Sequence, residues 1–382
     1  MNVIRVIGLM LIVLLFSACS GDSESSETKQ PTVISVYVFS PNNPIITRAD
    51  VGPVAPIENP ENENEGKITK LQIWVFNHDT GEKIAYYSPE SVANLNGTSA
   101  TGATYQLSVS EEFAQASTKP QVDVYVIANV TQDNCGMSFV EGTPRETLEA
   151  ALIQGNYFGL TNLTDRVPAD GLPMSGVQRG VTVSGSSPVY RLPENVVLTR
   201  AVSKIRFVFC REASEGNSAD NKKVQIQSVI LDKWMIPVKE SLFLGAASNV
   251  YETVNDDSKE FVDEVLADIP TSENPLQYVY QSQSAQEYEN LIATGVAAEE
   301  LKQLGPYYLR ESDELLQGTI TYQKEGEEAK TTEYKMAAAG DFSRNHTWIV
   351  YAYYSKSGLV AVTVVVKNWD DPTEKSHEVY NW

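Results

Sequence analysis

The sequence predicts a mainly β protein built from two β-sandwiches with a few short helices. Segments of alternating or wholly apolar residues, rich in β-branched and aromatic side chains, recur along the chain between polar breaks. The 382 residues are enough for two hydrophobic cores of ordinary size. Helical patterns are rare, so strands must form the framework.

The chain begins with a secretory signal pattern. Arg5 precedes an apolar run from Val6 to Phe16, which at about eleven residues is too short to cross a ~30 Å hydrocarbon core as a helix. Two small residues and a cysteine follow, a junction typical of a bacterial lipobox, although Phe16 stands where leucine is most frequent. We expect cleavage between Ala18 and Cys19 and lipid on Cys19. The alternative is an ordinary secretory signal with a chance cysteine.

A single strand is predicted ahead of a long linker. Residues 20–31 are small and polar and form a tether, and Val33–Phe39 is a strand with apolar residues on both faces. Ser40–Gly66 is rich in proline, Asn and Glu, so we expect no regular structure there. Arg48 is the only basic residue of this stretch and is followed by Ala49.

The strands of the first half follow. Leu71–Phe76 and Lys83–Tyr87 form a predicted hairpin, and Tyr105–Val109 is a further strand. Val122–Ala128 places three valines on one face and Asp123 with two apolar residues on the other.

One helix is clearly marked in this half. Thr143 is its expected N-cap, Pro144 its first residue and Glu146 part of the first turn, while Leu148 and Leu152 share a face. Short strands around Val181 and Tyr190 follow, and Gly185–Pro188 is a plausible domain boundary.

The second half opens with a long predicted strand, Val196–Phe209, followed by the half-exposed strand Val224–Leu231. Residues 245–283 are polar and irregular, and Gln286–Leu304 is predicted as a helix. The remaining predicted strands are 318–322, 331–336, 347–354 and 359–366. A polar break at 370–372 precedes the last segment, Ser376–Trp382.

Composition and motifs argue against catalysis and nucleic-acid binding. The net charge of −21 repels nucleic acid and anionic membrane surfaces. His78, His346 and His377 stand apart, without a second ligand at metal-binding spacing. No nucleophile elbow, P-loop or dinucleotide motif appears, so we expect no enzyme activity, no cofactor and no metal. Cys135 and Cys210 are either free or joined in one bridge.

The arrangement around Arg48 suggests a mechanism of assembly. Cleavage there would release the strand Val33–Phe39 together with the lipid anchor. A sandwich that loses a strand exposes unpaired N–H and C=O groups, which an incoming strand from another subunit can pair with. Such a head-to-tail contact does not close and therefore builds a filament.

Several stretches resemble one family. They are Val124–Asn129, Leu172–Gly176, Leu198–Ile205, Arg344–Trp348 and the ending from Trp369 to Trp382. In this order, spread over the whole chain, they resemble the FimA/Mfa-like fimbrillins, the subunits of type V pili.

The resemblance implies two transthyretin-like β-sandwich domains, export as a lipoprotein to the outer membrane, and maturation at the cell surface by an arginine-specific protease. The implied organisation is a signal peptide (1–18), a lipidated propeptide with a removable first strand (19–48), and two domains (49–187 and 188–382). The implied cut lies between Arg48 and Ala49, with Lys67 or Lys70 as alternatives because the linker is unusually long. The donor strand is expected within the C-terminal segment: Leu359, Val362, Val364, Val366, Val379, Tyr380 and Trp382.

Two functions are therefore open. The first is a shaft subunit that forms a head-to-tail homopolymer with other fimbrial subunits. The alternative is a tip or accessory fimbrial adhesin that binds a host or bacterial ligand. The C-terminal strand favours the shaft, since a tip has no further subunit to donate to. Ser376–Trp382 has a simpler interpretation as the edge strand of its own sandwich.

Overall fold

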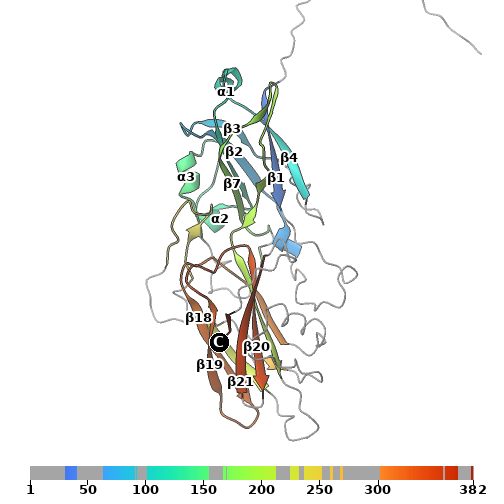
Figure 1. The fold of residues 1–382 in the computed structure, drawn as a ribbon, viewed down its shortest axis with the longest axis vertical. Coiled ribbons are helices and arrows are strands. Elements are labelled where there is room, and N and C mark those ends of the chain that lie inside the picture. The colour runs from blue at the N-terminus through green and yellow to red at the C-terminus, as the bar shows by residue number, and fades with distance from the viewer. Residues whose placement is uncertain are drawn as a thin grey trace, which may run out of the picture. The chain divides into compact units, whose positions relative to one another are not determined.

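The computed structural model describes residues 31–40, 63–90, 92, 101–154, 167–168, 170–211, 224–231, 236–251, 259–260, 267–269, 302–355, 358–368 and 380–381. These residues form several antiparallel and mixed sheets with a few short helices, which confirms the predicted mainly β class (Figure 1). None of the helices in the described ranges has the length and apolar character needed to span a bilayer.

Two sheets contain strands from the first part of the chain. Sheet I has the order β10 (Val196–Val197), β1 (Val33–Ser40), β9 (Val189–Arg191) and β8 (Ser184–Ser186), with β4 (Thr101–Ser108) also paired to β1. Sheet II has the order β11 (Thr199–Arg200), β7 (Met174–Val181), β5 (Val122–Ala128), β2 (Leu71–Asn77) and β3 (Lys83–Tyr87).

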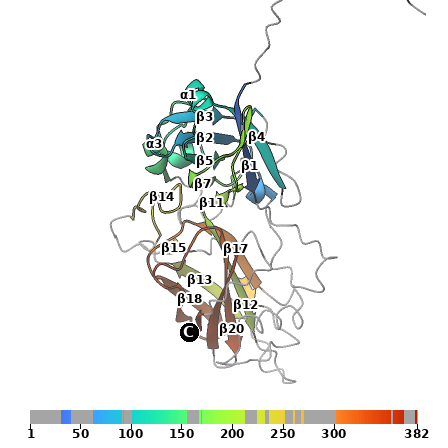
Figure 2. The ribbon, with the colours of Figure 1, turned by 45° about the horizontal axis from the view of Figure 1, so that its top comes forward.

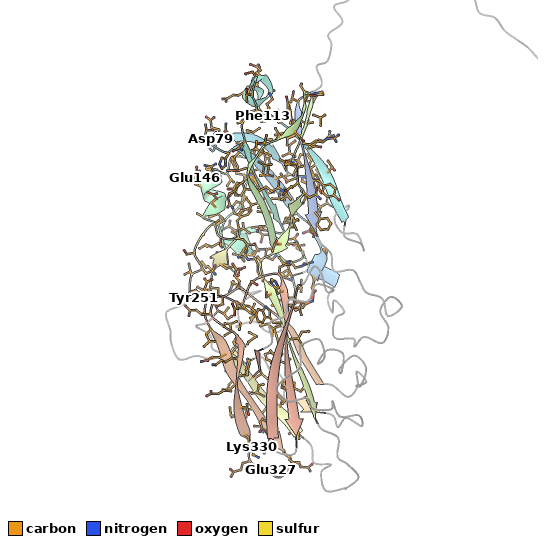
Figure 3. The ribbon with its side chains drawn as sticks, viewed as in Figure 1. Asp79, Phe113, Glu146, Tyr251, Glu327 and Lys330 are labelled. Carbon is orange, nitrogen blue, oxygen red and sulfur yellow. The ribbon has the colours of Figure 1, made fainter. Side chains whose placement is uncertain are left out.

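Sheets I and II share one apolar core. The side chains of Ile34, Val36 and Val38 from β1 and of Val75 and Val124 from sheet II are fully buried in it. The short helix α1 (Glu111–Gln115) adds Phe113 to the same core (Figure 3). Sheets I and II therefore form a sandwich.

The other face of sheet II is covered as well. Trp74 and Tyr125 lie there in a second cluster with Leu148, Leu242 and Phe243. The covering elements are α2 (Gln132–Cys135), α3 (Arg145–Glu149), and the pair β6 (Leu152–Ile153) and β14 (Glu240–Ser241). As a result β5 is buried on both faces. The residues on each of its faces are those predicted from the sequence.

The second part of the chain forms sheets III and IV (Figure 2). Sheet III has the order β17 (Lys302–Leu309), β12 (Ser203–Arg211), β20 (His346–Ser355), β21 (Gly358–Asn368) and β22 (Tyr380–Asn381). Sheet IV has the order β15 (Lys259–Glu260), β13 (Val224–Leu231), β18 (Leu316–Lys324) and β19 (Lys330–Ala337), with β16 (Ala267–Ile269) on β13. Phe207 and Trp348 of sheet III and Ile226 and Tyr334 of sheet IV share one buried core.

The predicted strand Val196–Phe209 is divided among three sheets. Its residues form β10 in sheet I, β11 in sheet II and β12 in sheet III. Leu198, which lies between β10 and β11 in the sequence, is buried. Ala201 and Val202, which lie between β11 and β12, are buried as well. Every residue of the run is compatible with an extended backbone, so the points where it leaves one sheet for the next are not visible in its apolar pattern.

Two helix predictions require correction. Helix α3 begins at Arg145 with Pro144 as its N-cap, and the Thr143 hydroxyl instead accepts a hydrogen bond from Val140 N at 2.9 Å. Leu152 lies in β6, beyond the end of α3. Of the predicted helix Gln286–Leu304, residues 302–304 belong to β17, and the remainder lies outside the described residues.

Two stretches that were predicted as a domain boundary and as an irregular linker contain regular elements. Gly185–Pro188 falls within the β8–β9 hairpin, whose strand β9 pairs with β1, and β10 and β11 still join sheets I and II. The proline-rich stretch, expected to be irregular throughout, ends in a 3-10 turn, η2 (Glu63–Gly66), whose Glu65 side chain is buried.

A buried charge cluster fixes β14. Glu240 is fully buried; its Oε2 accepts a hydrogen bond from Glu311 N at 2.8 Å, and its Oε1 lies 3.7 Å from Arg344 Nη2. Arg344 also donates to Ser241 O at 2.6 Å and to Glu311 Oε1 at 2.6 Å. Burial, opposed by the nearby charges of Arg344 and Arg310, raises the pKa of Glu240 to about 8.

This raised pKa predicts a pH-dependent stability. The unfolded chain releases the Glu240 proton near the ordinary value of 4.5, whereas the folded protein holds it up to about 8. The folded state therefore binds more protons between these values, and the free energy of unfolding falls as pH rises through this window. Glu240→Gln, which resembles the protonated side chain, is expected to flatten this fall in urea titrations at several pH values.

Asn249→Ala is the control, because Asn249 Oδ1 accepts from Ser241 N at 3.1 Å in the same segment and carries no titratable group. It should shift the curve of unfolding free energy against pH without changing its slope. Parallel curves for the wild type and Glu240→Gln would contradict the assignment.

Candidate functional site

Strand β1 lies in the interior of sheet I. Strand β4 pairs antiparallel with it from Val33 to Ser40. On the opposite edge, β9 pairs in parallel with Val33–Ser35 and β10 in parallel with Val38–Phe39. Both edges of β1 are therefore hydrogen-bonded to other strands, although a proline-rich stretch separates it from the rest of the sequence.

The two faces of β1 differ. Ile34, Val36 and Val38 point into the core and are fully buried, whereas Ser35 and Tyr37 are half-buried. A Cβ built on Gly102 of β4 would lie 2.2 Å from the Tyr37 ring, so only glycine permits this approach. The core thus contains three β-branched side chains from β1. On the other face of β1, the Tyr37 ring packs against Gly102 of β4.

Further backbone hydrogen bonds hold the two ends of β1. Val33 N donates to Pro188 O at 2.8 Å, and Leu198 N donates to Phe39 O at 2.8 Å. Beyond the strand, Val109 N donates to Thr32 O at 3.1 Å. The segments that hold β1 at its ends come from far apart in the sequence, so sequence reasoning did not find them.

The predicted processing residues Ala18, Cys19, Arg48 and Ala49 lie outside the described residues, as do the predicted donor residues Val379 and Trp382. The other predicted donor residues lie in sheet III: Leu359, Val362, Val364 and Val366 belong to β21, and Tyr380 belongs to β22.

In the structure the C-terminal strands pair within their own sheet. Strand β21 pairs antiparallel with β20 along its length. Strand β22 pairs with β21 through Thr363 with Asn381 and Val364 with Tyr380, and is the last strand of sheet III. The predicted donor segment therefore forms one end of sheet III, and the structure does not bring it together with β1.

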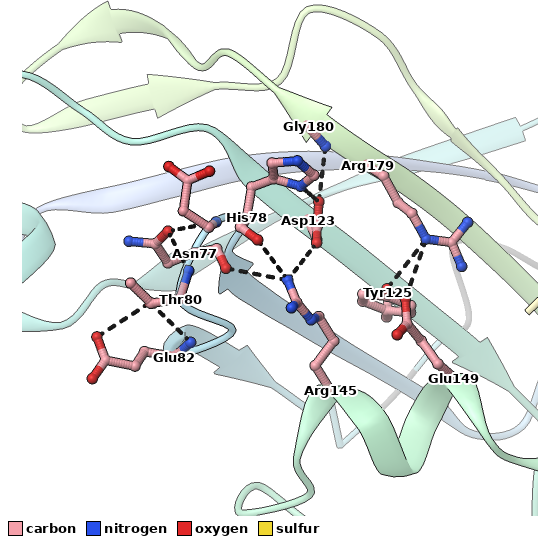
Figure 4. A network of polar contacts seen from close by, with 11 residues as sticks. Asn77, His78, Thr80, Glu82, Asp123, Tyr125, Arg145, Glu149, Arg179 and Gly180 are labelled. Atoms are coloured by element: carbon pink, nitrogen blue, oxygen red, sulfur yellow. Dashed lines mark hydrogen bonds and ion pairs between the residues drawn. The ribbon is translucent and has the colours of Figure 1, made fainter.

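A polar network fixes the outer side of sheet II (Figure 4). The buried carboxylate of Asp123 contacts His78 Nδ1 at 2.7 Å and Arg145 Nη1 at 2.9 Å, and accepts from Gly180 N at 2.8 Å. Arg145 Nη1 also donates to His78 O at 2.7 Å. The network ties α3 and the β2–β3 turn to β5 and β7. The polar residue inside the apolar strand Val122–Ala128 was the sequence signal for it.

Two other buried polar side chains of this region are structural. Burial and a hydrogen bond to Glu149 at 2.5 Å raise the pKa of Tyr125 above its ordinary value, so the hydroxyl stays protonated as a donor. Burial raises the pKa of the Cys135 thiol to about 12, and this cysteine is free. A thiol held protonated in this way is a poor nucleophile. Among the described residues, no three His, Cys, Asp or Glu side chains are grouped to hold a metal ion.

Comparisons with known proteins point to fimbriae. Residues 55–225 match a family model described as major fimbrial subunit protein (FimA). No curated protein matches the chain.

Among solved structures, the chain is similar to the tip fimbrial protein Mfa3 from Porphyromonas gingivalis with C-terminal truncation. The identity is 13% and the TM-score 0.48, over 89% of this chain and 100% of that one. It is also similar to a fimbrilin (fimA) from Porphyromonas gingivalis W83, with 12% identity and a TM-score of 0.46 over 92% and 96% of the two chains. A fimbrial assembly protein from Parabacteroides distasonis gives 14% identity and a TM-score of 0.41 over 92% and 99%. The match of residues 55–225 to the family of major fimbrial subunit proteins confirms the resemblance to fimbrillins that the sequence motifs predicted.

Proposed function

We propose that this chain is a structural subunit of a surface fimbria, and that it polymerises when a protease removes β1 and a strand of another copy replaces it. The observation that carries the proposal is the place of β1. A strand that precedes a proline-rich stretch with a single basic residue, Arg48, lies in the interior of sheet I. The role is structural and not enzymatic.

Loss of β1 would leave a groove with a strong affinity for another strand. The buried apolar side chains of β1 are Val33, Ile34, Val36 and Val38. At ~1.5–3 kcal/mol each, their burial contributes roughly 6–12 kcal/mol before the cost of ordering the strand. The facing edges of β4 on one side and of β9 and β10 on the other would lose their backbone partners. An incoming strand would restore both the core and the hydrogen bonds.

We propose the end of sheet III as the source of that strand. Val362, Val364 and Val366 alternate along β21 as Ile34, Val36 and Val38 do along β1. Strand β22 is the last strand of the sheet, so it can leave without breaking an interior pairing. We propose that the donor comes from this end: Leu359, Val362, Val364, Val366, Val379, Tyr380 and Trp382. Since donor and groove are different surfaces of one chain, the contact propagates into a head-to-tail filament.

The proposed precursor is exported, lipidated at Cys19 after cleavage at Ala18, and held at the outer membrane until an arginine-specific surface protease cuts it between Arg48 and Ala49. The mature part would then consist of two sandwich domains in the fimbrium at the cell surface. The sheets favour a division between them after Arg200 and not at residue 187, because β9, β10 and β11 pair within sheets I and II.

Maturation at Arg48 is tested by N-terminal sequencing of the surface form, which is expected to begin at Ala49. Arg48→Gln should keep the propeptide and remain monomeric in electron micrographs, because β1 then stays in sheet I. Lys29→Gln, which changes the nearest basic residue on the other side of β1, should mature and polymerise normally. A surface form that begins at Ile68 or Leu71 would move the cut to a lysine.

Lipidation is tested by metabolic labelling with palmitate. Cys19→Ala is expected to abolish labelling and to release the precursor from the membrane fraction, because a single cysteine follows the signal pattern. Ser17→Ala, which keeps a small residue before the cysteine, should be labelled normally. Labelling that persists in Cys19→Ala would show that the junction is not a lipobox.

The C-terminal donor is tested by deleting residues 376–382. Under the proposal the truncated subunit folds, because β20 and β21 are retained, but stays monomeric after cleavage. If the segment is only an edge strand, the deletion lowers the melting temperature and the folded protein still polymerises. Filaments of normal length from the truncated subunit would refute the donor assignment. A full-length matured chain found only at filament ends would instead support the tip or accessory adhesin.

A further inference from the structure

The segment that follows the linker carries the next two basic residues after Arg48. These are Lys67 and Lys70, which lie between η2 and β2. Lys67 is half-buried, Ile68 is fully buried, and the side chain of Lys70 is exposed. Because the Lys70 side chain is exposed, burial does not protect this site from a protease that recognises basic residues.

The peptide carbonyl groups of both lysines are bound by one residue, Asn129. Its side-chain amide Nδ2 donates to Lys67 O at 2.7 Å, and its backbone N donates to Lys70 O at 3.1 Å. Its Oδ1 accepts from Thr69 N at 2.9 Å, so the bonds of Asn129 span the segment 67–70. A serine- or cysteine-type protease must hold the carbonyl oxygen of the bond it cuts in its own oxyanion hole. In this segment Asn129 already donates a hydrogen bond to that oxygen at both lysine sites.

The position of Asn129 is itself fixed. It is 2% exposed, its Nδ2 also donates to Leu172 O at 2.9 Å, and its φ of 56° lies in the left-handed region that asparagine tolerates. Gly171, at φ +91°, completes the site, because a Cβ there would lie 2.1 Å from Lys67 O. The chain can bind Lys67 in this way only with glycine at 171.

A second attachment holds the upstream end of the segment. Glu65 Oε2 forms an ion pair with Lys204 Nζ at 2.8 Å, and both side chains are almost fully buried. The Tyr308 hydroxyl donates to Glu65 Oε1, and Arg200 Nε donates to Glu65 O at 3.1 Å. Opening the segment from the linker side therefore requires a buried carboxylate to leave its partners, which is strongly unfavourable.

We infer that Asn129, with Glu65 upstream, closes residues 63–70 to proteolysis, so that between β1 and β2 a basic-residue-specific protease cuts only at Arg48. The inference rests on the proposed maturation step, and it assigns to Asn129 the protection of the two lysine sites from a protease that accepts lysine as well as arginine. It also predicts that the mature chain retains the linker from Ala49 onwards and not only the part that begins at Ile68 or Leu71.

The test is limited digestion of the full chain with trypsin, followed over time by N-terminal sequencing of the products. The wild type is expected to yield Ala49 as the early terminus. Asn129→Gly suits the left-handed backbone and removes only the side chain, so the terminus at Ile68 should appear about tenfold faster than in the wild type. The terminus at Leu71 should increase less, because the backbone N–H of residue 129 still binds Lys70 O.

Two further variants separate local from global effects. Asn129→Asp keeps the acceptor for Thr69 N but loses the donor to Lys67 O, so it should also expose the Lys67 site. Val229→Ala removes core volume in sheet IV, far from the segment in sequence, and should lower the melting temperature without exposing that site.

Three results would overturn the inference: an Ile68 terminus from the wild type as early as Ala49, an unchanged rate at Lys67 in both Asn129 variants, or an equal increase in Val229→Ala. Wild type that is cut only at Arg48 yet forms no filaments would refute the proposed function and leave the inference intact.

Discussion

The pairing of β1 on both edges is the constraint on which sheet I depends. Within the described part of the chain, strand β4 pairs only with β1 in that sheet, and β10 joins the sheet only through β1. The side chains that β1 places in the core belong to the same cluster as the valines of β2 and β5. An element with so many contacts is normally continuous with the rest of a fold. Here it is joined to β2 through a proline-rich stretch, so a single cut in that stretch would leave β1 held by non-covalent contacts alone.

Sheet II packs against sheet I on one face only, so its packing does not depend on sheet I alone. Both of its faces are covered, one by the core shared with sheet I and the other by a separate aromatic cluster around Trp74 and Tyr125. The Asp123 network holds the β2–β3 turn and α3 from that outer side (Figure 4). Loss of β1 would therefore remove one wall of one core, while the second cluster and its polar attachments stay complete. If the proposed exchange of β1 takes place, this division of roles would let the sandwich lose a strand and remain folded.

Local pattern was sufficient for most strands, and long-range pairing was not. The bounds of β13 and β5 match the strands predicted from the sequence. The sequence placed Asp123 on a face with two apolar residues, and its partner Arg145 was found only in the structure. The strands that pair with β1 could not be predicted from the sequence, because β9 and β10 follow it by more than 140 positions and pair in parallel without a turn signal. The buried Glu65 was hidden in a stretch whose composition indicates only loop. The helix at Arg145 begins one residue later than predicted because the Thr143 hydroxyl is used in the preceding turn.

The division of Val196–Arg211 among three sheets has a mechanical consequence. This short length of chain runs from β10, which is bonded to β1, through β11 in sheet II to β12, the neighbour of β20 in sheet III. Tension applied to a strand in the place of β1 would pass through the β10 backbone bonds into this covalent path and reach sheet III directly. Near its middle the path is held sideways by Arg200 and Lys204, which both bind Glu65. A fibre of such subunits would carry load along continuous peptide bonds inside each subunit, and its weakest points would be the hydrogen-bonded joints between subunits.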